Sequence, residues 1–208
     1  MKKIFLLLAI SLVMPGRAIC DEADDCFRRG IERFRSGDTN GAMTEFNKVI
    51  DLEPKYLYAY PNRAFLRQAK GDYDGAIADF DKAIALKPDF LAAYNNRGNT
   101  KQLKGDLDGA IADFTKAIEI KPDYAFAYHN RGNAKKAKGD QAGALVDYNQ
   151  AIRLNPDYVA AYINRGIVKG DKGDLTGALS DFNKAVALDP GSSMARENID
   201  KVKKQMAK

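Results

Sequence analysis

The pattern of apolar and polar positions over residues 91–122 predicts two helices joined by a tight turn. Successive residues of a helix are rotated by about 100°, so residues three or four apart share one stripe. Small and aromatic residues occupy that stripe: Tyr94 and Gly98 in the first helix, and Ala110, Phe114 and Ala117 in the second. We therefore expect a first helix over residues 91–104 and a second that ends near residue 120.

Turn-forming residues separate these two predicted helices. Gly105 suits the left-handed backbone conformation that commonly ends a helix. Asp106 or Asp108 can cap the amino end of the second helix, and Pro122 prevents that helix from continuing. The segment is therefore expected to fold as helix, turn, helix.

The whole pattern returns every 34 residues. The phrase GDLDGAIADFTKAI, which begins at Gly105, has copies that begin at Gly71, Gly139 and Gly173 and a looser one at Gly37. Such a period is typical of stacked two-helix units, because one helix pair cannot bury its apolar stripe alone. The predicted repeats span residues 23–56, 57–90, 91–124, 125–158 and 159–192.

A tail over residues 193–208 follows the last repeat. It opens with serines that could cap a helix, and Ile199, Val202 and Met206 fall on one of its faces. We expect a capping helix that covers the last repeat with its apolar side.

The leader, residues 1–20, has the composition of a secretory signal peptide. Two lysines precede an apolar run over residues 4–14, and small residues follow near a candidate cleavage site. The run is too short to span a membrane, which takes about 20 apolar residues in a helix. Cleavage after Ala18 and cleavage after Cys20 both fit, and a lipid anchor on Cys20 is a third alternative. The mature protein is expected to be exported, either periplasmic or secreted, with no transmembrane segment.

The charge balance argues against nucleic acid as a partner. The net charge is +5, but the leader holds three cations and no acid, so thirty cations face twenty-eight acids in the remainder. A net charge of +2 with both signs interspersed lacks the basic patch that nucleic-acid binding requires.

Every repeat carries cations on the stripe that should pack against its second helix. Arginine occupies the seventh position throughout: Arg29, Arg63, Arg97, Arg131 and Arg165. The eleventh position is also cationic: Arg33, Arg67, Lys101, Lys135 and Lys169. An acid occupies the twenty-third position: Glu45, Asp79, Asp113, Asp147 and Asp181.

Cations on a packing stripe need partners, because an unpaired buried charge is costly. Two antiparallel helices bring the seventh and twenty-third positions level, so we expect a structural ladder of arginine–carboxylate pairs, within or between adjacent repeats. The alternative is that these side chains bury their stems and extend their charged ends into water.

The repeats resemble the tetratricopeptide repeat family in the size of the residues at fixed positions. The third repeat has Tyr94, Gly98, Ala110, Phe114, Ala117 and Pro122 where that family has an aromatic, a small residue, alanine, an aromatic, alanine and proline. The fourth has Tyr128, Gly132, Ala144, Tyr148, Ala151 and Pro156. The resemblance covers five consecutive repeats and implies an all-α, right-handed α-solenoid. Cations at the seventh and eleventh positions depart from the family pattern, which prefers apolar or aromatic residues there.

An asparagine recurs at the sixth position, on the stripe that faces away from the packing seam: Asn62, Asn96, Asn130 and Asn164. In the resembled family this stripe lines a concave groove. A carboxamide offers both a donor and an acceptor, so it can pair with the backbone of an extended peptide whatever its sequence. The four resemble the asparagine ladder in the repeats of O-GlcNAc transferase, which holds peptides in this way. The alternatives are a solvated polar residue or a bond to a neighbouring helix.

Other residues share the predicted groove: Tyr58, Phe126, His129, Asn99 and Asn133. Such a mixture of aromatic rings and amides suits an extended peptide or a partner helix. The two-carboxylate clamp with which some family members hold chaperone tails is not matched, because its lysine is missing from the fifth position.

Nothing in the sequence indicates catalysis. His129 is the single histidine, and no histidine–cysteine cluster or phosphate-binding glycine loop is present. Cys26 is interpreted as a small buried core residue, or as a disulfide partner of Cys20 if both remain in the mature chain. We expect a non-enzymatic scaffold without metal or cofactor that binds a protein or peptide. The alternative is a structural component that assembles with itself, or docks into an envelope complex through its convex face.

Overall fold

The computed structural model of the protein describes residues 20–207, with side chains from residue 22 onward. Residues 1–19 of the predicted signal peptide, the candidate cleavage site after Ala18 and the side chain of Cys20 therefore lie outside the described part of the chain. Helices account for the regular structure of this part of the chain, and no strand occurs in it, so the predicted all-α class is confirmed. No helix within it is long and apolar enough to cross a membrane.

Each of the first four predicted repeats contributes a pair of helices. The pairs are α1 (Cys20–Arg35) with α2 (Thr39–Leu52), α3 (Ala59–Ala69) with α4 (Tyr73–Leu86), α5 (Leu91–Lys104) with α6 (Leu107–Ile120), and α7 (Ala125–Ala137) with α8 (Gln141–Leu154). A further pair, α9 (Val159–Asp171) with α10 (Leu175–Leu188), precedes a last helix, α11 (Ser193–Met206). The helices expected over residues 91–104 and up to residue 120 are confirmed.

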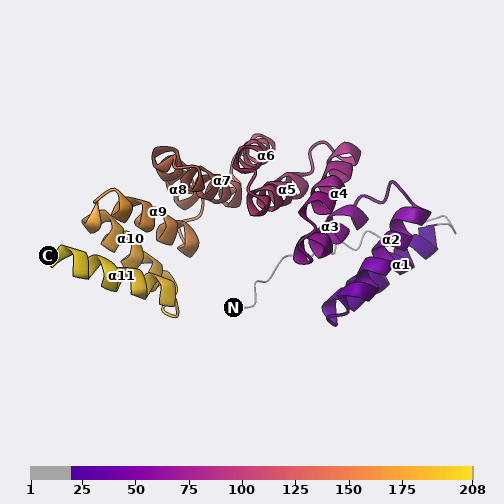
Figure 1. Cartoon of the computed structure of the whole chain (residues 1–208), viewed down its shortest axis with the longest axis horizontal. Helices are drawn as coiled ribbons and strands as arrows, with labels where there is room; N and C mark the ends of the chain where they lie inside the picture. Colours follow the sequence, from indigo (N-terminus) through magenta and orange to yellow (C-terminus); the bar gives the residue numbers. More distant parts are fainter. Residues whose placement is uncertain (1–19, 208) are drawn as a thin grey trace. The chain divides into compact units, whose positions relative to one another are not determined.

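The chain divides into two compact units, before and after the bond between Ala93 and Tyr94 within α5. In the first unit α2 packs against α1 and α3, and α3 packs against α4 (Figure 1). In the second unit α7 packs against α6 and α8, and α9 packs against α8 and α10. Most of the packing inside each unit is therefore between consecutive helices, and α9 also contacts α7 and α11 in the second unit.

The turn inside each pair is built from the same glycine and aspartate. Gly105 has a φ of 93°, a left-handed conformation that a residue with a Cβ rarely adopts. Asp106 then caps α6, and its carboxylate accepts a hydrogen bond of 2.9 Å from the backbone N–H of Gly109. Of the two aspartates considered for this cap, Asp106 is therefore the one used. The equivalent caps are Asp38, Asp72, Asp140 and Asp174.

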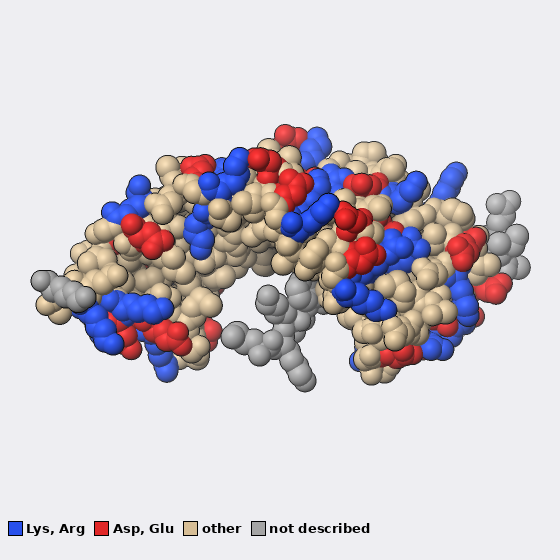
Figure 2. Space-filling model, viewed as in Figure 1, with Lys and Arg blue, Asp and Glu red and all other residues tan. Residues whose placement is uncertain are grey.

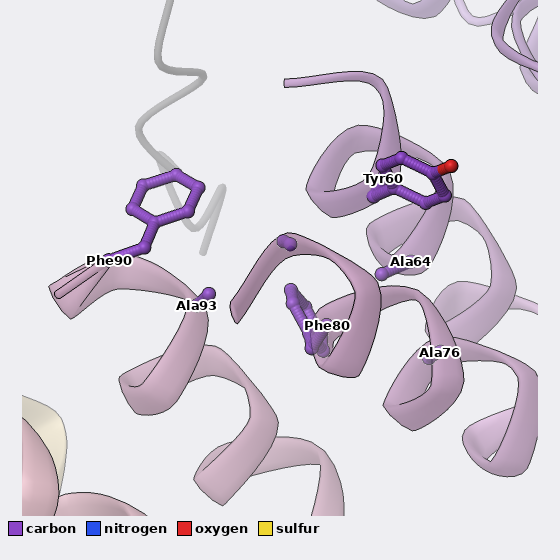
Figure 3. Close-up of a cluster of buried hydrophobic side chains, with 7 residues drawn as sticks. Tyr60, Ala64, Ala76, Phe80, Phe90 and Ala93 are labelled. Carbon is purple, nitrogen blue, oxygen red and sulfur yellow. The ribbon is translucent and has the colours of Figure 1, made fainter. Parts of the chain in front are cut away.

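Small residues let the two helices of a pair approach closely around a buried ring. A Cβ added to Gly98 would lie 2.7 Å from Cε1 of Phe114, which is closer than two carbons can pack. In the first unit, Phe80 of α4 lies among alanines of α3 and α4 together with Tyr60, Phe90 and Ala93 (Figure 3). Close-packed rings and alanines of this kind form the core of each unit.

The last helix packs against α10 as a cap, with one departure from the expected apolar face. Ser192 accepts a hydrogen bond from the backbone of Ala195 at the start of α11. Val202 is buried and Ile199 is half-buried, but Met206 is 50% exposed. Met206 lies in the last turn of α11, beyond the reach of the core beneath Val202, so the prediction that it shares the covered face is corrected.

Candidate interaction face

In the fourth repeat Arg131 and Asp147 form a two-point ion pair. Nε and Nη2 of Arg131 donate to Oδ2 and Oδ1 of Asp147 at 3.0 and 2.7 Å. Nζ of Lys135 lies 2.8 Å from the same carboxylate, which is only 1% exposed. A buried carboxylate thus has two cations of its own repeat around it, which offsets much of the cost of removing it from water.

The same arrangement recurs along the chain. The seventh-position arginine lies 2.6 Å from the acid in Arg63–Asp79, 2.5 Å in Arg97–Asp113 and 2.6 Å in Arg165–Asp181. The eleventh-position cation reaches the same acid in Arg67–Asp79, Lys101–Asp113 and Lys169–Asp181. All these pairs are formed within one repeat, and each arginine also lies over the ring of a tyrosine three residues earlier: Tyr60, Tyr94, Tyr128 and Tyr162.

The first repeat is a weaker version of this arrangement. Arg29 lies 3.1 Å from Glu45, and its side chain is 45% exposed. Burial by itself would raise the pKa of the Glu45 carboxyl, but the hydrogen bond and positive charge of Arg29 outweigh it and lower that pKa. Nη2 of Arg29 also lies 2.9 Å from the sulfur of Cys26, which is a free, buried thiol.

A second set of polar contacts links one repeat to the preceding one, and sequence reasoning missed it. The seventh-position arginine uses its remaining nitrogen, Nη1, for these contacts. Arg63 donates to Asn47 at 2.9 Å, Arg131 to Thr115 at 3.1 Å and Arg165 to Asn149 at 2.7 Å. These acceptors all occupy the twenty-fifth position of their repeats. The recurrence of a short polar residue at that position, with the period of the fold, was the available signal.

The sixth-position asparagines fall into different environments. Asn62 in the first unit is half-buried and donates to the carbonyl of Tyr58, the residue just before its own helix, at 2.7 Å. In the second unit Asn96 is exposed, whereas Asn130 is half-buried and donates to Oδ1 of Asn95 at 3.1 Å. Asn164 uses both amide hydrogens, toward Oδ1 of Asn133 and Nε2 of His129, each at 2.9 Å. Asn130 and Asn164 therefore bond to the neighbouring helix, which was the alternative to a freely exposed ladder.

His129 lies at the centre of this network rather than on an open surface. It is 7% exposed, and its Nε2 faces the amide nitrogen of Asn164, which can only donate. The ring proton therefore belongs on Nδ1, which lies 3.1 Å from the hydroxyl of Tyr158 and 3.4 Å from Oδ1 of Asn130. Burial lowers the pKa of His129 to about 4, so the imidazole is neutral in ordinary buffers. A residue expected in a peptide groove is thus a structural link between α7 and α9.

Two further hydrogen bonds extend this network. Asn95 is buried and accepts from Asn130, and the hydroxyl of Tyr148 donates to Asn133 at 2.8 Å. Burial raises the pKa of Tyr148, with a further contribution from the charge of Asp147, and burial also raises the pKa of Tyr158. Both phenols therefore stay protonated; the Tyr148 hydroxyl donates to Asn133, and the Tyr158 hydroxyl accepts from Nδ1 of His129. We call the residues Asn95, Asn96, Asn99, His129, Asn130, Asn133 and Asn164 the amide face of the second unit.

Two asparagines of the amide face keep open hydrogen-bonding groups. Asn99 is half-buried, and its side chain makes no hydrogen bond within the described residues. Asn96 is exposed, and the only hydrogen bond of its side chain within the described residues is a long one of 3.5 Å, which Nδ2 of Asn95 donates to its Oδ1. The amide face thus combines a fixed network with at least two carboxamides that can still bind something else.

Aromatic rings adjoin the amide face. Phe126 is 50% exposed, with its ring centroid 5.2 Å from that of Tyr158 and 5.7 Å from that of Tyr124. Tyr58, the equivalent residue in the first unit, is half-buried and packs edge-on against Phe90 at 6.1 Å. Phe126 therefore offers an accessible ring beside the amides, whereas Tyr58 is largely part of the packing of its own unit.

Charged side chains of both signs are mixed over the face of the molecule shown in Figure 2. The amide face, in contrast, has neither an acid nor a permanent cation among its seven members. No cluster of histidine, cysteine or carboxylate side chains suited to a metal ion occurs among the described residues.

Solved structures with the same fold include proteins of the resembled family. MamA from Desulfovibrio magneticus RS-1 is 20% identical, with 85% of this chain and 99% of that one covered and a TM-score of 0.76. YrrB, described as a TPR protein with an unusual peptide-binding site, is 17% identical, with 87% and 97% covered and a TM-score of 0.68. The first TPR domain of Spaghetti, bound to an HSP90 peptide, is 27% identical, with 57% and 94% covered and a TM-score of 0.55.

Comparison of the sequence with models of protein families identifies the family of the chain. No curated protein matches the chain. A model described as TPR repeat matches residues 67–105, 102–139 and 132–171, and one described as tetratricopeptide repeat matches residues 159–192. These matches span more than half of the chain and agree with its paired helices, capped turns and small-residue packing. The chain belongs to the tetratricopeptide repeat family.

Proposed function

We propose that the protein is a non-enzymatic scaffold that binds an extended segment of another protein on the amide face. The observation that carries this proposal is the pair of carboxamides at Asn96 and Asn99, each with hydrogen-bonding groups that no described residue satisfies. A carboxamide can donate to a peptide carbonyl and accept from a peptide N–H at the same time. It can therefore hold a main chain without selecting its side chains.

The fixed part of the network supports this role through preorganisation. Asn130, Asn133 and Asn164 are already immobilised by bonds to Asn95, Tyr148 and His129, respectively. A binding surface whose side chains are fixed before the partner arrives loses less conformational entropy on association. The bonds between helices thus prepare the surface on which Asn96 and Asn99 are presented.

The charge of the face indicates which partner segments fit. The similar Spaghetti domain is bound to the acidic peptide SRMEEVD. Here the fifth positions in the second unit hold Asn95, His129 and Ile163, and burial keeps His129 neutral. Without a cation at these positions, an acidic tail would lose water without gaining an ion pair. We therefore expect an uncharged or weakly charged segment.

The test is the affinity of a peptide selected on the protein from a random displayed library. Replacing Asn96 and Asn99 together by alanine should weaken that affinity about tenfold, since each change removes hydrogen bonds to the peptide backbone. Asn183→Ala, at an exposed asparagine of α10, is the matched control. Unchanged affinity in the double variant would refute binding at the amide face. Light scattering on the free protein addresses the alternative of self-assembly, which requires oligomers that grow with concentration.

Export is part of the same proposal. The apolar run after two lysines in residues 1–20 supports a signal peptide that directs the chain out of the cytoplasm. The mass of the mature protein, purified from a cell fraction of the source, would distinguish cleavage after Ala18, cleavage after Cys20 and lipidation of Cys20. A full-length chain in the cytoplasmic fraction would refute export.

A further inference from the structure

A cavity of about 330 Å³ lies between α9, α10 and α11 in the second unit. Phe182 and Val202, both buried, and the half-buried Ile167 contribute its apolar lining. Gly170 and the polar side chains of Asp171, Asn198, Lys201 and Gln205 also border it. Its volume is at the lower end of the range for pockets that hold small ligands or single side chains.

The glycine at position 170 opens this cavity without a packing reason. The equivalent residues of the four preceding repeats have large side chains: Phe34, Gln68, Gln102 and Lys136. A Cβ added to Gly170 would meet nothing closer than Cβ of Ala178 at 3.7 Å, an ordinary contact. A glycine inside a helix destabilises it relative to alanine, and here neither the turn nor a neighbouring ring requires one. The absence of a side chain at Gly170 therefore leaves room for the cavity.

The border of the cavity is electrically balanced. Asp171 of α9 and Lys201 of α11 are both exposed, and neither forms an ion pair within the described residues. One carboxylate and one ammonium beside an apolar lining favour an occupant without net charge. A charged side chain would meet one like and one opposite charge there, so it would gain no net attraction to offset its loss of water.

The cavity continues the amide face along α9. Ile167 lies one helical turn after Asn164 and on the same side of the helix. Ile163, Ile167 and Gly170 lie on one stripe, because residues four and seven apart share a face of a helix. A segment that lies across Asn164 therefore passes the mouth of the cavity.

We propose that this cavity receives one large apolar side chain of the partner segment, which rests on the proposed binding at the amide face. The amides hold the main chain regardless of sequence, and the cavity between α9, α10 and α11 selects a side chain at one position. Partner segments should therefore share an apolar residue, of the size of leucine, flanked by uncharged residues.

Two capped peptides test this on the full chain by NMR. One has leucine at the centre of alternating glycine and serine, and the other has glycine in place of that leucine. The methyl signals of Ile167 and Val202 report on the cavity, and the side-chain amide signals of Asn96 and Asn99 report on the amide face. We expect the leucine peptide to bind about tenfold to a hundredfold more tightly, because burying such a side chain is worth that much. The methyl signals should move with the leucine peptide alone.

Filling the cavity provides the variant and its control. Gly170→Leu should abolish the advantage of the leucine peptide, whereas Gln102→Leu, at the same register of α5 but outside the cavity, should retain it. Gly170→Gln introduces the residue found at this register in α3 and α5, and it serves if the leucine variant misfolds. An advantage that persists in the filled variants, or equal affinity of the two peptides for the native chain, would overturn the proposal. If the amide signals of Asn96 and Asn99 then shifted equally with both peptides, the amide face would remain a binding site without a selective cavity. If neither these amide signals nor the methyl signals of Ile167 and Val202 shifted, the result would count against the proposed function as well.

Discussion

Asp147 receives two parallel hydrogen bonds from the guanidinium of Arg131, at 3.0 and 2.7 Å, in a place where its carboxylate is 1% exposed. The fixed fork of arginine matches a carboxylate in this way, and a lysine ammonium does not. The pair thus holds the first helix of the repeat against the second by a contact with defined geometry.

Removing this acid should be costly. Asp147→Ala leaves Arg131 and Lys135 with their charges beside a cavity, so we expect the free energy of unfolding to fall by about 3 to 5 kcal/mol. The measurement is urea unfolding followed by circular dichroism. Asp108→Ala, which removes the exposed partner of Lys138, is the control and should cost no more than about 1 kcal/mol. Equal losses in the two variants would contradict a structural role for the buried pair.

The contact between repeats should also be measurable. Asn149→Ala removes the acceptor that Nη1 of Arg165 uses at 2.7 Å, and it should destabilise the protein by about 1 kcal/mol. Asn183→Ala provides a comparison at the same position of the last repeat, where the side chain forms no hydrogen bond within the described residues. The Asn183→Ala variant should have the same midpoint urea concentration of unfolding as the native protein. A cost for Asn183→Ala as large as for Asn149→Ala would argue against the contact.

His129 should make the stability depend on pH. Its pKa is lowered by burial from 6.5 to about 4, so the unfolded chain binds a proton at a higher pH than the folded chain does. The stabilisation is complete above about pH 6.5 and is lost as the pH falls toward 4, by about 3 kcal/mol in total. Urea unfolding between pH 7 and pH 4.5 should show the decline, and His129→Gln should flatten it.

The single imidazole also gives a direct readout, because the chain has one histidine. The ring signals of His129 in proton NMR should stay constant from pH 7.5 to pH 5. A midpoint near 6.5 would mean that the ring is accessible to water and that the network around it is not formed.

Replacement by alanine should change the stability in opposite directions at two glycines, Gly98 of α5 and Gly170 of α9. Gly98→Ala forces a Cβ to within 2.7 Å of the ring of Phe114, and we expect a loss of about 1 to 3 kcal/mol from overpacking. Gly170→Ala meets only an ordinary contact and should gain up to about 1 kcal/mol from better helix propensity. Thermal unfolding of both variants compares them. A loss at Gly170 would mean that this glycine has a packing role after all.

The helices and turns could be predicted because their signals are local. Gly105, Asp106 and Pro122 act within a few residues of their own positions, and a period of 34 residues multiplies each signal. The pairing of Arg131 with Asp147 followed from the same periodicity, since two helices joined by a short turn have few ways to align. The sequence left open whether the pairs form within a repeat or between repeats, and the structure places them within.

The amide face could be predicted only in outline. The side of the helix on which Asn130 and Asn164 lie follows from helical rotation, but their partners come from α5 and α7, at a distance set by how repeats stack. Burial of His129 depends on Tyr158, the last residue of its own repeat, and on Asn164 of the following repeat, so the pattern inside one repeat contains only part of that information. The acceptors at Asn47, Thr115 and Asn149 were missed for the same reason.

The guanidinium groups of Arg63, Arg131 and Arg165 each reach sixteen residues forward to an acid and sixteen residues back to a small polar group. A tandem duplication of one 34-residue segment would therefore supply both halves of its new junction from copies of existing residues. Such a protein can be lengthened by gene duplication alone, without any new pair of side chains having to evolve. Each duplication would also add one sixth-position residue to the proposed binding surface.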